Sequence, residues 1–215
     1  MRILIADDHG IVREGLKALL DKQSGMEVVG EAEDGQSAVA MAEQLSPDLL
    51  VMDMSMPNLN GIEATRQILE HSPGTRVIIL SMHSEKDIVK EALEAGVSAY
   101  VLKSHLFDEM LRALEAVAKG ERYLSPRITD VVIDGYLGES AGGASSGTPK
   151  LTGRERQIVQ LVAEGKTVKE IARVLHISPK TADTNRRHVM NKLGISSVAE
   201  LTKYAIREGL TSLEF

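Results

Sequence analysis

The segment Leu49-Leu50-Val51-Met52-Asp53 decides the fold of this chain, because it joins an uninterrupted apolar run to a carboxylate. Apolar runs of this length, separated by segments of helical periodicity, are typical of strands buried in a parallel sheet. The carboxyl ends of such strands lie along one edge, where open α/β sheets bind their ligands. Three further runs have the same form: Ile3-Leu4-Ile5-Ala6 before Asp7-Asp8, Val77-Ile78-Ile79-Leu80 before Ser81, and Ala99-Tyr100-Val101-Leu102 before Lys103. The sequence therefore predicts that these polar side chains converge at one point.

The first 120 residues alternate between strand and helix patterns. The alternation predicts right-handed crossovers and a doubly wound, flavodoxin-like α/β domain with a five-stranded parallel sheet in the order 2-1-3-4-5. Strands are expected at 2–6, 27–32, 48–52, 76–80 and 98–102, and helices near 11–22, 36–45, 61–71, 85–95 and 107–119.

Length and composition indicate two globular domains. The chain has 215 residues, of which 43% are hydrophobic and 26% charged, and it contains no cysteine. Disulfides and thiolate metal sites are thereby excluded. No apolar stretch approaches the ~18 residues of a membrane span, and the start of the chain does not fit a signal peptide. We therefore expect a cytoplasmic protein without a membrane partner.

Charge is distributed unevenly along the chain. Residues 150–215 carry 12 Lys and Arg against 7 Asp and Glu, whereas residues 1–149 carry 13 against 24. Residues 150–215 thus have a net charge of +5 and residues 1–149 a net charge of −11. This difference indicates that only residues 150–215 bind a polyanion. Residues 138–149 are rich in Gly, Ser and Ala, and we predict a flexible linker there, preceded by a short helix over 128–137.

The predicted edge of the sheet has the composition of a phosphoryl-acceptor site. Asp7, Asp8 and Asp53 offer the hard oxygen ligands that Mg²⁺ prefers. Lys103 can pair with phosphoryl oxygens as a point charge, and the Ser81 hydroxyl can donate a hydrogen bond to them. Asp53 is the expected nucleophile, because it ends the central strand.

With these residues the chain resembles the receiver domain of bacterial two-component response regulators. The resemblance covers about residues 1–120 and rests on Asp7-Asp8, the segment from Asp53 to Gly61, Ser81, Tyr100 and Lys103. It implies that a sensor histidine kinase or a small acyl phosphate phosphorylates Asp53. It also implies that Asp8, Asp53 and the Ser55 carbonyl ligate Mg²⁺ with Asp7 in support, and that Ser81 and Tyr100 move inward as the switch.

The chain departs from the receiver pattern after Lys103 and carries distinctive residues beside the acceptor. Many receivers have a proline with a cis peptide bond after the lysine, but this chain has Ser104, so a cis bond is not assumed. His83 and Ser55 occupy positions that tune the phosphoryl lifetime in receivers. The remaining histidines show no ligand spacing and are interpreted as structural; they are His9, His71, His105, His176 and His188.

Residues 150–215 have the pattern of four helices. Thr152 and Glu155 form a capping box before the first helix, which runs to Gly165, and the second spans about 168–175. Ser178-Pro179 opens the third helix, which ends at Leu193-Gly194, and a fourth covers about 197–208. A helix, a short turn and a Ser-Pro-initiated helix have helix-turn-helix spacing.

The third of these helices has one polar face suited to DNA. Ala182, Val189 and Leu193 define its buried side, and the opposite side presents the expected readers of the major groove. Other cations are better placed for phosphates. The candidate DNA contacts are Lys169, Lys180, Thr181, Thr184, Arg186, Arg187, Asn191 and Lys192.

The second half of the chain resembles a LuxR-type helix-turn-helix. The resemblance rests on residues 151–155, 170–172, 177–181 and 192–194, and with the receiver it extends to the NarL/FixJ type of response regulator. It implies dimerisation through the last helix, around Val198, Leu201 and Ala205. The expected domains are a receiver at 1–122, a helical extension and linker at 123–149, and an all-α DNA-binding domain at 150–215.

The function expected from both halves is transcriptional control by phosphorylation of Asp53. The expected cofactor is Mg²⁺, and the expected partners are a histidine kinase, double-stranded DNA, a second copy of the chain on DNA, and RNA polymerase. Two alternatives stay open. An Mg²⁺-dependent aspartyl-phosphate phosphatase would carry an acid two residues after the nucleophile, where this chain has Ser55. An interaction-only regulator would bind protein instead of DNA.

Overall fold

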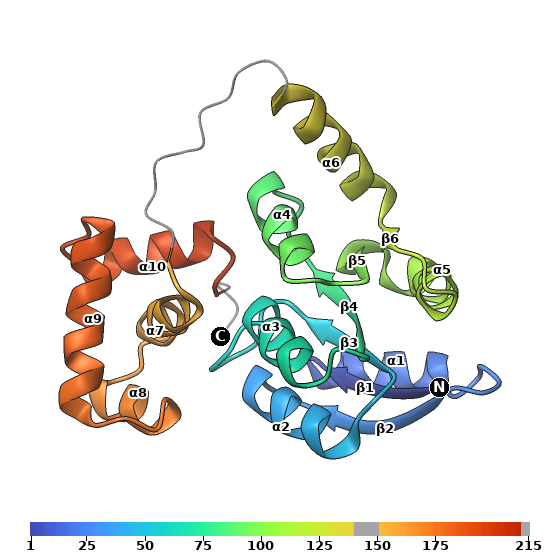
Figure 1. Ribbon diagram of the computed structural model, residues 1–215, viewed down its shortest axis with the longest axis horizontal. Coiled ribbons are helices and arrows are strands. Elements are labelled where there is room, and N and C mark those ends of the chain that lie inside the picture. The colour runs from blue at the N-terminus through green and yellow to red at the C-terminus, as the bar shows by residue number, and fades with distance from the viewer. Residues whose placement is uncertain (140–150, 212–215) are drawn as a thin grey trace.

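A computed structural model describes residues 1–139 and 151–211 of the chain. Residues 1–139 form a unit built around a parallel sheet, here called the sheet unit, and residues 151–211 form an all-helical unit, here called the helical unit (Figure 1).

The sheet has six parallel strands in the order β2-β1-β3-β4-β5-β6. The first five strands confirm the predicted order, and β3 is central with Asp53 as its last residue. The prediction of five strands was wrong by one, because a two-residue strand pairs in parallel with β5. Two residues are too few to leave a periodic signal in the sequence. The strands are β1 (Arg2–Ala6), β2 (Glu27–Ala32), β3 (Leu49–Asp53), β4 (Arg76–Ser81), β5 (Ala99–Leu102) and β6 (Tyr123–Leu124).

Helices cover both faces of this sheet, so its strands are buried on both sides. Apolar side chains of α2, α3 and α4 pack on one face, together with Leu4 and Leu50. Side chains of α1 and α5 pack on the other, together with Ile3 and Val51. The helices are α1 (Gly10–Leu20), α2 (Gly35–Leu45), α3 (Gly61–His71), α4 (Lys86–Glu94) and α5 (Leu106–Ala118), with a 3-10 turn at Lys103–His105.

Helix α6 (Pro126–Glu139) continues the sheet unit beyond the sixth strand. Ile128 is buried in the same core cluster as the α4 residues, so α6 is attached to the sheet unit beside α4. The helix is longer than predicted and includes Gly138 and Glu139, the first two residues of the expected linker. The rest of that linker, 140–149, lies outside the described residues.

The helical unit contains the four predicted helices around a separate apolar core. Thr152 and Glu155 form the predicted capping box of α7, and Ser178 caps α9 with Pro179 as its first residue. Gly194 adopts the left-handed conformation (φ 67°) that ends α9, as expected for a glycine at this position. The helices are α7 (Gly153–Ala163), α8 (Val168–Val174), α9 (Pro179–Leu193) and α10 (Val198–Arg207).

The face of α10 that sequence reasoning assigned to dimerisation is for the most part turned inward. Leu201 and Ala205 are 1% and 0% exposed and belong to the core against α7, whereas Val198 is 45% exposed. A four-helix unit of this size needs apolar residues from its last helix to complete its core, so that stripe cannot also be a free surface. Within the described residues, no helix is both long and apolar enough to cross a membrane.

Candidate phosphoryl-acceptor site and nucleic-acid interface

Three of the predicted site residues meet at the carboxyl edge of the sheet. Lys103 Nζ lies 2.9 Å from Asp7 Oδ2 and 3.0 Å from Asp53 Oδ2, which joins the ends of β1, β3 and β5. Asp7 and Asp53 are 0% and 2% exposed. The convergence of residues nearly a hundred positions apart is the arrangement that the parallel topology predicts.

Burial disfavours the charged form of the Asp53 carboxyl group. Burial, with the charge of Asp7 acting in the same direction, raises the pKa of Asp53 to about 7, although Lys103 opposes the shift. Burial also acts to lower the pKa of Lys103, but the charges of Asp53 and Asp7 outweigh it and raise that pKa. A second cation beside the carboxylates would therefore be strongly favoured.

The residues fit a hard divalent cation. Ligand atoms from Asp7, Asp8, His9 and Asp53 all lie within 4.8 Å of one another. Asp7 Oδ2 and Asp53 Oδ2 are buried, and their charge is balanced in part by Lys103 Nζ, which lies 2.9 Å from the first and 3.0 Å from the second. Carboxylate oxygens left in this state are suitable ligands for Mg²⁺, which binds through one or two carboxylates, waters and phosphate. Ser55 lies on the loop after Asp53, and its carbonyl stays a predicted ligand.

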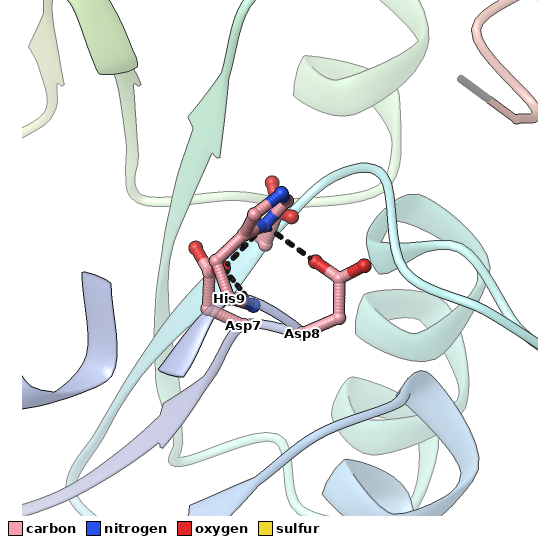
Figure 2. Close-up of side chains that lie close together, drawn as sticks. Asp7, Asp8 and His9 are labelled. Carbon is pink, nitrogen blue, oxygen red and sulfur yellow. Dashed lines mark hydrogen bonds and ion pairs between the residues drawn. The ribbon is translucent and has the colours of Figure 1, made fainter. Parts of the chain in front are cut away.

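His9 also belongs to this pocket, which sequence reasoning missed by interpreting it as structural. Its Nδ1 lies 3.1 Å from Asp7 Oδ1 and 2.8 Å from Asp8 Oδ1 (Figure 2). The backbone N–H of His9 also donates to Asp7 Oδ1 at 2.9 Å, which fixes the turn that carries the three side chains. The available signal was its position directly after Asp8 on the strand-end loop, rather than any ligand spacing.

The two predicted switch residues are connected through His83. The N–H of His83 donates to Ser81 Oγ at 2.9 Å, and the Tyr100 hydroxyl donates to the His83 carbonyl at 2.9 Å. Tyr100 is 0% exposed, so in this structure its ring already points inward, and burial raises its pKa. The Lys103–Ser104 peptide bond beside them is trans.

The predicted base-reading face of α9 is open to solvent. Ala182 and Val189 are each 1% exposed, and they turn the opposite side of the helix outward. In Figure 1, α9 lies on the far side of the helical unit from the sheet. Among the predicted contacts, Lys169 of α8 and Lys180, Thr181, Thr184, Arg187 and Asn191 of α9 are exposed, whereas Arg186 and Lys192 are half-buried.

Two of the predicted phosphate contacts already have carboxylate partners. Asp183 bridges Arg186 Nη2 at 3.0 Å and Arg187 Nη2 at 2.7 Å. Lys192 Nζ lies 2.7 Å from Glu155 Oε2 in the capping box of α7. Arg187 keeps 73% of its side chain exposed, so it remains free to reach a ligand. A phosphate bound by Lys192 would compete with the Glu155 carboxylate for the same ammonium group.

Both units match known families at the level of sequence. Residues 3–115 match the response regulator receiver domain, and residues 149–205 match the bacterial regulatory proteins of the luxR family. This chain is a response regulator of the NarL/FixJ type. A receiver domain followed by a LuxR-type helix-turn-helix is the domain arrangement of this family, which explains why the acidic pocket and the helical unit occur in one chain.

Similar proteins match this response regulator along almost its whole length. It is 36% identical over 214 residues to the oxygen regulatory protein NreC of Staphylococcus carnosus, covering 98% of this chain and 99% of that protein. NreC of Staphylococcus aureus is 37% identical over the full length of both chains. The structure of RcsB from Salmonella enterica serovar Typhimurium bound to promoter rprA with the phosphomimetic BeF₃⁻ is similar with a TM-score of 0.64, at 29% identity, covering 95% of this chain and 97% of RcsB.

Proposed function

We infer that this response regulator accepts a phosphoryl group on Asp53 and thereby controls sequence-specific DNA binding and transcription. The observation that carries the inference is the position of Asp53, which is buried at the end of the central strand and 3.0 Å from Lys103 Nζ. Family membership supports the regulatory role, and RcsB, which is similar over 95% of this chain, is known in a structure of an RcsB–DNA complex.

The chemistry that we propose is an in-line transfer to a carboxylate. An Asp53 carboxylate oxygen attacks the phosphorus of a phosphohistidine on a sensor kinase; the P–O bond forms as the P–N bond breaks, and the imidazole nitrogen leaves with the electron pair and takes its proton from water. Mg²⁺ held by Asp8, Asp53 and the Ser55 carbonyl, with Asp7 in support, would neutralise the phosphoryl oxygens. Lys103 would pair with one of those oxygens, and Ser81 would donate a hydrogen bond to another.

The site favours storage of the phosphoryl group over turnover. A phosphatase of the aspartyl-nucleophile class needs an acid two residues after the nucleophile to protonate the leaving group, and the Ser55 hydroxyl is far too weak an acid for that role. We therefore propose a regulator rather than an enzyme. We further propose that it pairs on DNA and acts in the cytoplasm with RNA polymerase.

The direct test is phosphoryl incorporation followed by intact-protein mass spectrometry. With acetyl phosphate and Mg²⁺ the full chain should gain one phosphoryl mass, and Asp53→Ala should gain none. Asp48→Ala is a matched control, because Asp48 is an exposed aspartate immediately before the same strand. Incorporation that persists unchanged in Asp53→Ala would remove Asp53 as the acceptor.

A further inference from the structure

Ser125 is a buried polar residue at the point where β6 ends and α6 begins (Figure 1). It is 1% exposed, and each of its polar groups has a partner in the sheet unit. Its backbone N–H donates to the Tyr100 carbonyl of β5 at 2.9 Å, and its carbonyl accepts from the N–H of Ile128 at 2.8 Å in the first turn of α6. The backbone of Ser125 is therefore used by the strand on one side and by the helix on the other.

The hydroxyl of Ser125 extends the hydrogen bonding of β5 past the last residue of β6. That strand ends at Leu124, and the buried N–H of Leu102 donates to Ser125 Oγ at 3.0 Å. A serine before a proline is expected to cap the helix that follows, but this hydroxyl faces the strand. A side chain thus supplies the acceptor that a neighbouring strand would ordinarily provide, and it satisfies a backbone group that is costly to bury unpaired.

Glu109 fixes the direction of this hydroxyl. The hydroxyl of Ser125 donates to Glu109 Oε2, which belongs to the first turn of α5. A serine hydroxyl carries a single hydrogen together with its acceptor lone pairs. Because the hydrogen is directed to Glu109, the lone pairs are available to the N–H of Leu102. Glu109 is itself 8% exposed, so its carboxyl group is held in the interior of the sheet unit, where the chemistry proposed for Asp53 does not use it.

The residue held by Ser125 directly precedes Lys103, the cation of the acceptor site. Lys103 Nζ lies 2.9 Å from Asp7 Oδ2 and 3.0 Å from Asp53 Oδ2. A lysine carries its charge on a long flexible stem, so the position of the ammonium group depends on where the backbone places that stem. The backbone leaves the sheet at this point, because Leu102 is extended (φ −77°, ψ 130°) and the 3-10 turn begins at Lys103. Ser125 therefore anchors β5 where the chain turns.

We propose that Ser125 is a positioning residue for Lys103, and that Glu109 orients Ser125 for this role. The proposal rests on the proposed function of Asp53, since Lys103 acts there on the phosphoryl oxygens. Ser125 touches no reacting atom; it fixes the end of the strand from which Lys103 extends. A displacement of about 1 Å in such a group can cost on the order of 100-fold in rate, so a loosened anchor slows phosphoryl acceptance.

Amine labelling of Lys103 in the full-length chain measures its position without any phosphoryl chemistry. In EDTA, wild-type Lys103 should react slowly with acetic anhydride, because its side chain is 13% exposed and paired with two carboxylates. Ser125→Ala should label Lys103 several-fold faster, as read by peptide mass spectrometry. Lys119, which is exposed at the end of α5, is the internal control and should label equally in both proteins.

Further variants separate the hydrogen bonds from packing. Ser125→Cys keeps the shape of the side chain but replaces the hydroxyl with a weak acceptor, so it should label Lys103 as Ser125→Ala does. Glu109→Gln keeps an acceptor for the hydroxyl hydrogen and Glu109→Leu does not, so only the second should label Lys103 faster than wild type. Ser98→Ala is the matched control, because Ser98 lies at the other end of β5 and contacts β4 and β6 through its backbone. Far-UV circular dichroism checks that each variant is folded.

Phosphoryl incorporation from acetyl phosphate and Mg²⁺ tests the consequence for the reaction. Ser125→Ala and Ser125→Cys should be phosphorylated roughly 10-fold more slowly than wild type, which is less than the full cost of misplacing a group by about 1 Å. Ser98→Ala should keep the wild-type rate. In a Lys103→Ala background, Ser125→Ala should cause no further loss, because two residues that act through one group are not additive.

Three results would overturn the proposal and leave the proposed function intact. They are unchanged labelling of Lys103 in Ser125→Ala, a Ser125→Cys variant that behaves as wild type, and a loss of rate in Ser125→Ala that adds in full to that of Lys103→Ala. Wild type that accepts no phosphoryl group at Asp53 would overturn the proposed function itself, and the labelling of Lys103 would still decide whether Ser125 positions it.

Discussion

Asp53→Asn should stabilise the metal-free protein at pH 8, because it removes a buried negative charge that lowers the free energy of unfolding. The folded structure raises the pKa of Asp53 from 3.8 to about 7, chiefly through burial and then through the charge of Asp7. A raised carboxylate pKa favours folding while the group is protonated. That contribution is complete below pH 3.8 and is lost as the pH rises through about 7.

The size of the effect follows from the shift. At ~1.36 kcal/mol per pKa unit, the change from 3.8 to about 7 corresponds to about 4 kcal/mol at pH 8. At pH 5 the folded group is already protonated, and the cost falls to about 2 kcal/mol. Because Asp53 is only 2% exposed, solvent screening does not reduce these values much. The shift already includes the opposing charge of Lys103, so we expect up to about 4 kcal/mol at pH 8, or up to ~16 °C in Tm for a unit of this size.

The assay is urea unfolding in EDTA at pH 8 and pH 5, followed by far-UV circular dichroism because the chain has no Trp. Asp130→Asn, which changes an exposed carboxylate on α6, is the matched control and should have little effect. Addition of Mg²⁺ at pH 8 should stabilise the wild type more than Asp53→Asn and so reduce their difference. The reasoning is refuted if Asp53→Asn is no more stable than wild type at pH 8, or if its advantage is the same at pH 5.

Two further predictions concern the helical unit. Arg187→Ala should lose preference at particular base pairs by roughly 1–3 kcal/mol if Arg187 contacts guanine in the major groove, because its side chain is 73% exposed on the reading face. Lys192→Ala should lower the affinity for all DNA sequences alike and reduce the magnitude of the salt dependence of binding by roughly 0.9. Binding-site selection and salt titration measure these effects. If Arg187→Ala keeps the wild-type sequence preference while Lys192→Ala changes it, α9 is rotated from the predicted orientation. A fragment of residues 149–215 should bind DNA more tightly than the unphosphorylated full chain, because the deleted segment carries a charge of about −11 that repels DNA. The fragment should fold, since the helical unit has its own apolar core. The advantage should shrink as salt rises, and equal affinities at equal dimer concentration would contradict the prediction.

Local patterns in the sequence determined most of the fold. Continuous apolar runs are readable because a strand buried on both faces has no polar face to alternate with. Once the strands were placed, parallel topology brought Asp7, Asp53 and Lys103 to one edge, and the structure confirms that they meet. The caps at Thr152 and Ser178 were also predictable, because a capping box depends on residues three positions apart.

The tertiary structure alone decided the features that depend on contacts between distant segments. The sixth strand forms where two residues pair with β5 at the edge of the sheet. Leu201 is buried in the core of the helical unit, which its side chain helps to fill. His9 entered the acidic pocket through the geometry of one turn. The contact between Ser125 and Leu102 was equally hidden, since a serine before a proline has the same sequence pattern whether its hydroxyl caps the next helix or binds a neighbouring strand. Periodicity reports which side of an element is apolar, and only the assembled chain determines which polar side chain finds its partner on a distant segment.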